Sequence, residues 1–101
     1  MNILINIHTD SELIAYEAIA LAFTMASFDH QVQLFLGGRS DVVLQDPKSR
    51  LYGMIQSLDL YDIPKAWHGF DGINHLPLDI IDHIEVAPQD DPSQFDSVLS
   101  F

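Results

Sequence analysis

The chain has 101 residues, of which 48% are hydrophobic, so it is long enough to form one domain with its own core and too apolar to be disordered. Fifteen acidic residues against four lysines and arginines give a net charge of −11, which excludes the basic surface that binds nucleic-acid phosphates. No apolar run approaches the length of a membrane span, and no basic, signal-like start is visible, so we expect a cytoplasmic protein with no membrane partner.

The first third of the chain predicts a strand followed by a long helix. Residues 2–8 are nearly all apolar, as in a strand that is covered on both faces of a sheet. Thr9 and Glu12 have the spacing of a capping box, which predicts Thr9 as the N-cap. Apolar residues then cover most sides of a helix that ends near Phe28. This pattern predicts a deeply buried helix that contacts a second layer or another subunit.

Shorter elements follow along the chain. Strands are predicted at 31–36, 66–68, 84–86 and 98–101. Helices are predicted at 39–45 and 49–60, with a loop at 69–77, a short apolar piece at 78–81, a polar connector at 89–94 and at most a helical turn at 93–95. Because strands alternate with helices, we expect a single α/β domain over residues 1–101. The expected architecture is a small three-layer open sheet, mostly parallel, with a flavodoxin-like strand order.

The loops after the first three predicted strands carry the candidate ligand-binding residues. Ligand sites in open parallel sheets form beyond the carboxyl ends of the strands. The candidate rim site consists of His8, Asp10, Arg39 and His68. Such side chains can bind a divalent ion, but no close ligand spacing accompanies them, and histidines bonded to the backbone are the simpler interpretation. We therefore predict no metal and no cofactor, and we interpret Gly37 and Gly38 as a turn rather than an anion cradle.

Aromatic residues gather near the third predicted strand. Tyr61, Trp67 and Phe70 lie within ten residues, which indicates either core packing or an interface with another subunit. The chain has no cysteine and no Gly-x-Ser-x-Gly motif, so we predict no catalytic residue.

Two stretches resemble a known family. Residues Leu58 to Ile63 with the following Trp67, together with Phe95 to Phe101, are similar to TusC-like members of the DsrE/DsrF-like sulfur-relay family. The resemblance implies a small α/β domain that assembles with related subunits, TusB, TusC and TusD, in a relay of sulfur toward 2-thiouridine in tRNA. The sulfur-carrying cysteine of this family belongs to the TusD/DsrE-type subunit. Alignment on Trp67 puts Gly69 at or near the position of that cysteine.

The resemblance implies a noncatalytic TusC/DsrF-like subunit, because a chain without a thiol cannot hold a persulfide. Its expected partners are TusB/TusD-like (DsrE/DsrH-like) subunits or further copies of itself, with no direct contact to nucleic acid. The chain departs from the family where Gly38-Arg39-Ser40 replaces a frequent Asp-Gly-Val, and in a shorter loop after the first strand. The alternative is a stand-alone α/β domain that binds a small ligand or a metal at the rim formed by His8, Arg39 and His68.

Overall fold

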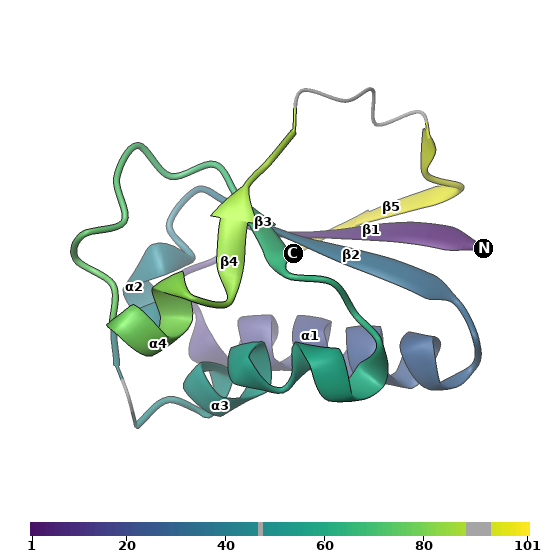
Figure 1. The fold of residues 1–101 in the computed structure, drawn as a ribbon, viewed down its shortest axis with the longest axis horizontal. Helices are drawn as coiled ribbons and strands as arrows, with labels where there is room; N and C mark the ends of the chain where they lie inside the picture. Colours follow the sequence, from purple (N-terminus) through teal and green to yellow (C-terminus); the bar gives the residue numbers. More distant parts are fainter. Residues whose placement is uncertain (47, 89–93) are drawn as a thin grey trace.

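The computed structural model describes residues 1–46, 48–88 and 94–101. Five parallel strands form one sheet in the order β4-β3-β2-β1-β5 (Figure 1). The strands are β1 (Asn2–Ile7), β2 (Gln31–Leu36), β3 (Ala66–His68), β4 (Ile84–Val86) and β5 (Ser97–Ser100). The helices are α1 (Glu12–Ser27), α2 (Asp41–Leu44), α3 (Arg50–Gln56), the 3₁₀ helix η1 (Leu58–Tyr61) and α4 (Leu78–Ile81).

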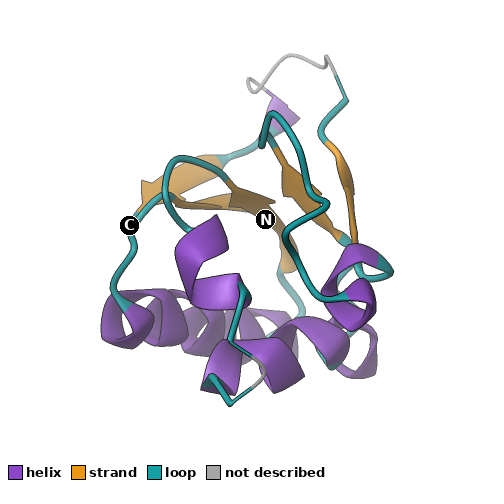
Figure 2. Ribbon diagram, turned by 90° about the vertical axis from the view of Figure 1, so that its left-hand side faces the viewer, coloured by secondary structure: helices purple, strands orange, loops and turns teal. Residues whose placement is uncertain are grey.

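The helices α1 to α4 all lie on one face of the sheet (Figure 2). Strands β1 to β4 follow one another across the sheet in chain order, so right-handed crossovers place every connecting helix on the same side. Most of the predicted connector at 89–94, and the start of the predicted turn at 93–95, lie outside the described residues.

The face opposite the helices is here called the open face. Side chains alternate between the two faces along a strand, so every second residue of β1, β2, β3 and β5 belongs to it. Its members are Asn2, Leu4, Asn6, Gln31, Gln33, Phe35, Trp67, Val98 and Ser100. None of the helices α1 to α4 covers this face. Phe35 and Trp67 are partly exposed on it, Phe95 packs against Trp67, and Leu4 is buried.

The predicted parallel α/β sheet is confirmed, and two finer features differ from the expectation. A flavodoxin-like sheet has the order 2-1-3-4-5, whereas here β3 and β4 extend the sheet beyond β2 and only β5 joins the free edge of β1. The helices α1 to α4 share one face and form one layer, so the described residues do not include the second helical layer of the expected three-layer fold.

The core lies between the helices and the inner face of the sheet. Ile5 and Leu34 from the sheet meet Ile19 and Ile55 from the helices, and all four are essentially inaccessible to solvent. Helix α1 buries only one face, through Ala15, Ala18, Ile19 and Ala22. Within this chain the helix is therefore not covered on most sides, and Leu13 is 65% exposed, while the predicted contact with another subunit stays a prediction.

Two helix boundaries also differ from the prediction. The N-cap of α1 is Ser11, whose Oγ accepts a hydrogen bond from the Ile14 N–H, while Thr9 Oγ1 accepts from the Ser11 N–H. Helix α3 ends at Gln56 instead of continuing to residue 60, and the chain tightens into η1. Among the described residues, none of the helices combines the length and the apolar character that a bilayer crossing requires.

Candidate functional site

The carboxyl ends of β1, β2 and β3 meet at one rim, as their parallel pairing requires. The Gly37 N–H donates to the Ile7 carbonyl (3.0 Å), the Arg39 N–H to the His8 carbonyl (3.1 Å), and the Gly69 N–H to the Leu36 carbonyl (3.0 Å). These backbone hydrogen bonds extend the pairing of each strand into the loop that follows it. The loops after β1, β2 and β3, which were predicted to share one rim, therefore lie side by side.

The side chains of the predicted rim site do not converge on one point. Arg39 and Asp10 form an ion pair at 3.4 Å, with both side chains largely exposed. The His8 ring lies 6.0 Å from the Phe35 ring, on the open face, whereas the His68 ring stacks on Phe70 at 5.6 Å on the helical side. Strand alternation separates the two imidazoles. Within the described residues, no three His, Cys, Asp or Glu side chains gather as a metal site would require.

His68 is buried, and its ring is hydrogen-bonded to the backbone. Its side chain is only 6% exposed, and its Nδ1 accepts a hydrogen bond from the Phe70 N–H (3.3 Å). Burial lowers the pKa of His68 below the ordinary value of 6.5, because the charged imidazolium is poorly solvated there. The ring is therefore mostly neutral at pH 7, and its proton is on Nε2 because Nδ1 accepts a hydrogen bond.

The Gly37-Gly38 pair makes a tight turn at the rim. Gly38 has a left-handed backbone (φ +56°), and a Cβ there would lie 3.0 Å from the His8 carbonyl oxygen. The buried Ser40 hydroxyl donates to the Gly37 carbonyl at 2.8 Å. The hydroxyl is thus engaged within the turn, which agrees with the interpretation of these glycines as a turn rather than an anion cradle.

Gly69, which the family resemblance aligns with the cysteine position, also sits at the rim. A Cβ built on Gly69 would lie 2.9 Å from Phe35 Cζ, closer than real side chains approach one another. The space that a side chain at this position would use is filled by an aromatic ring.

The three aromatic residues named as a candidate interface lie on different surfaces. Tyr61 stacks on Phe23 of α1, with ring centroids 4.1 Å apart. Trp67 lies on the open face and meets Phe95 edge to face at 6.0 Å. Phe70 packs on His68 at the helical side. Of the three, Trp67 alone belongs to the open face.

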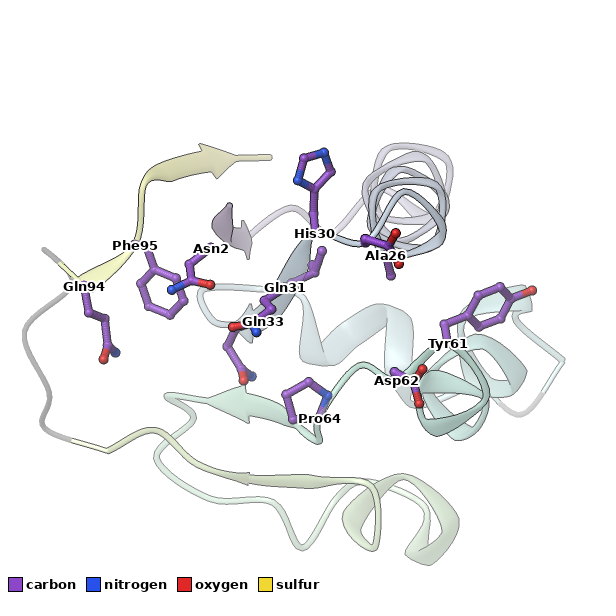
Figure 3. Close-up of a pocket in the computed structure, with 12 residues that line it drawn as sticks. Asn2, Ala26, His30, Gln31, Gln33, Tyr61, Asp62, Pro64, Gln94 and Phe95 are labelled. Atoms are coloured by element: carbon purple, nitrogen blue, oxygen red, sulfur yellow. The ribbon is translucent and has the colours of Figure 1, made fainter.

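A cleft of about 550 Å³ lies at the amino ends of the strands, far from the predicted rim site (Figure 3). Its walls include Asn2, Gln31 and Gln33 from the sheet, Asp29 and His30 before β2, Tyr61, Asp62 and Pro64 before β3, and Phe95. Sequence reasoning missed it, because its residues come from separate turns and strand starts with no common motif. The available signal was glutamine at 31 and 33, on one face of a strand otherwise rich in apolar residues.

Comparison with known proteins gives a structural likeness without sequence support. No family model matches the chain, and no curated protein matches it. Among solved structures, the ychN protein from E. coli aligns over 100% of both chains, with a TM-score of 0.69 and 19% sequence identity. At this identity the likeness concerns the fold alone, and it confirms the predicted α/β fold.

Proposed function

We propose that the chain is a noncatalytic, TusC/DsrF-like subunit of a sulfur-relay complex and contributes by assembly with TusB/TusD-like subunits. The complex would serve tRNA 2-thiouridine formation or a related sulfur transfer. One observation carries the proposal: a chain that resembles the DsrE/DsrF-like family in sequence, and that shares its fold with the ychN protein, contains no cysteine. A persulfide needs a thiolate sulfur to hold it, so the sulfur must travel on another subunit.

The packing around Gly69 supports a role for this chain that does not include carrying sulfur. The Phe35 ring fills the space beside Gly69, at the position that the resemblance aligns with the family cysteine. A carrier subunit needs an accessible sulfur atom there. This chain instead has a glycine under an aromatic ring, which suits a partner that shapes the complex without reacting.

The open face supports assembly as the contribution. Phe35 and Trp67 lie side by side on it, and Val98 at its edge is 48% exposed. Aromatic side chains at the centre of a surface are frequent anchors of subunit interfaces. We therefore assign the open face to contact with a homologous TusB/TusD-like subunit.

Co-expression with the TusB- and TusD-like proteins of the same organism tests the proposal. The chain carries an affinity tag, and the co-purified subunits are quantified. Val98→Asp places a charge on the open face and is expected to reduce co-purification at least tenfold, since an unpaired charge in an interface costs more than about 1.4 kcal/mol. Leu60→Asp is the matched control, because Leu60 is 79% exposed on η1, away from the open face.

Two results would contradict the proposal. One is a tagged chain that elutes alone while the other subunits assemble with each other. The second is that wild type, Val98→Asp and Leu60→Asp co-purify equal amounts of the other subunits, which would mean that the open face is not the interface.

A further inference from the structure

The cleft at the amino ends of the strands, here called the amino-end cleft, is rich in negative charge. Asp29 and Asp62 both line it, and no lysine or arginine belongs to its wall. His30 is the one side chain of the wall that can carry a positive charge. Among the described residues, no donor is hydrogen-bonded to either carboxylate. Both residues are exposed to solvent, and their charges give the cleft a negative potential.

The end of helix α1 adds to this negative potential. Ala26, in the last turn of α1, lines the same cleft. The carbonyl end of a helix carries a partial negative charge, which basic residues in the last turn usually offset. Helix α1 has no basic residue in its last turn. A cation that entered the cleft would be attracted by the helix end as well as by the two carboxylates.

Gln33 gives the floor of the cleft a fixed hydrogen-bond acceptor. The residue is 7% exposed, and its Nε2 donates both hydrogens, to the carbonyls of Leu34 (2.9 Å) and Lys65 (3.0 Å). Only the nitrogen of an amide can bond to two carbonyls, so the orientation of this amide is determined. Its Oε1 receives no hydrogen bond from any described residue. Figure 3 shows Gln31 and Gln33 in the middle of the cleft, between Phe95 and Asn2 on one side and Asp62 and Tyr61 on the other.

We propose that the amino-end cleft binds an organic cation, namely an alkylammonium or a guanidinium group. Such groups donate several hydrogen bonds and accept none, which matches the Gln33 Oε1 and the carboxylates of Asp29 and Asp62. The aromatic ring of Phe95 beside the amides suits the planar or methylene part of the ligand. A metal ion is a poorer match, since the described residues contain no group of three metal-binding side chains. The inference does not rest on the proposed assembly role, although Gln31, Gln33 and Phe95 place the cleft at the amino end of the open face.

Calorimetric titration with arginine amide and with citrulline amide tests the charge requirement. The two ligands have nearly the same shape, but citrulline carries a neutral urea in place of the guanidinium. Spermidine and an acetylated peptide with a single arginine then distinguish a free polyamine from a side chain of a protein partner. Wild type is expected to bind arginine amide and not citrulline amide, with weaker binding at higher salt because the charges are screened.

The variants Asp29→Asn and Asp62→Asn identify the site. Both aspartates have left-handed backbones (φ 67° and 59°), which asparagine tolerates, so the fold is preserved while the charge is lost. Each variant is expected to weaken the binding of arginine amide about fivefold, as the loss of an exposed ion pair would. Asp71→Asn, an exposed position outside the cleft, is the matched control and should bind like wild type. Equal binding of both amides to wild type, or unchanged binding by Asp29→Asn and Asp62→Asn, would overturn the proposal.

Discussion

Phe35 and Trp67 are direct partners in neighbouring parallel strands, and both side chains lie on the open face of the sheet. Trp67 is the sole tryptophan of the chain, so it reports on this face without interference from elsewhere in the molecule. Its ring is partly exposed and meets Phe95 edge to face. The two rings provide aromatic surface on the face of the sheet that none of the helices α1 to α4 covers. The proposed subunit contact would use this surface.

Trp67 fluorescence should shift to shorter wavelength when the partner subunits bind. An assembly that covers the open face transfers the indole from a partly hydrated to an apolar environment. The measurement is the emission spectrum of the mixture, from which the spectrum of the mixture with Trp67→Phe is subtracted. An unchanged difference spectrum in an assembled complex would place the interface elsewhere.

Introducing the family's cysteine at Gly69 should destabilise the protein. The new side chain would meet the Phe35 ring at 2.9 Å, so Gly69→Cys is expected to cost about 1–3 kcal/mol of unfolding free energy, as for other overpacked sites. Urea unfolding under reducing conditions measures this change. Gly72→Cys is the matched control, because a Cβ at Gly72 meets no atom within 4 Å. Equal stability of the two variants would mean that the Phe35 ring gives way without cost.

Ser11→Ala should destabilise helix α1 through the loss of its N-cap. The Ser11 hydroxyl accepts from the Ile14 N–H, and loss of such a cap costs about 1 kcal/mol. Thr24→Ala is the control, since Thr24 lies in the interior of α1 and its hydroxyl bonds only to the Ala20 carbonyl of the same helix. That control should stay within about 0.5 kcal/mol of wild type, because alanine has the higher helix propensity. Thermal unfolding that ranks the two variants in the opposite order would contradict the assigned cap.

The buried His68 should make folding stability fall under mildly acidic conditions. Its pKa is lowered in the folded state by burial, so the unfolded chain binds a proton first. The contribution of neutral His68 is fully present above the ordinary pKa of about 6.5 and is lost as the pH falls from there through the lowered folded-state pKa. His68→Asn keeps an acceptor for the Phe70 N–H and removes the titration. The difference in unfolding free energy between wild type and this variant should therefore change between neutral pH and pH 5, and parallel curves would contradict the prediction.

The sequence predicted the elements better than their arrangement. The strand at 31–36 and those at 66–68 and 84–86 were predicted correctly, because apolar runs bounded by Gly, Pro and Asp are local signals. Leu13 of α1 is exposed in this chain, since apolar character alone does not say which side of a helix meets the sheet or whether another subunit covers it. The strand order could not be derived, because it depends on pairing between distant segments.

The candidate site was predicted less well than the fold. The rim loops were expected to meet, and their backbones do, but the side chains of His8 and His68 point to opposite faces of the sheet. A shift of one residue in strand register decides the face, which residue type alone does not determine. The amino-end cleft had no motif at all, because Asp29, Gln33 and Asp62 meet only after folding.

Native mass spectrometry of the chain mixed with TusB- and TusD-like proteins shows whether the proposed assembly forms. We expect one complex that contains this chain together with both of these proteins, with persulfide mass additions on a cysteine-bearing subunit and none on this chain. A complex of these proteins that forms without this chain, or a sulfur adduct on this polypeptide, would contradict the proposal.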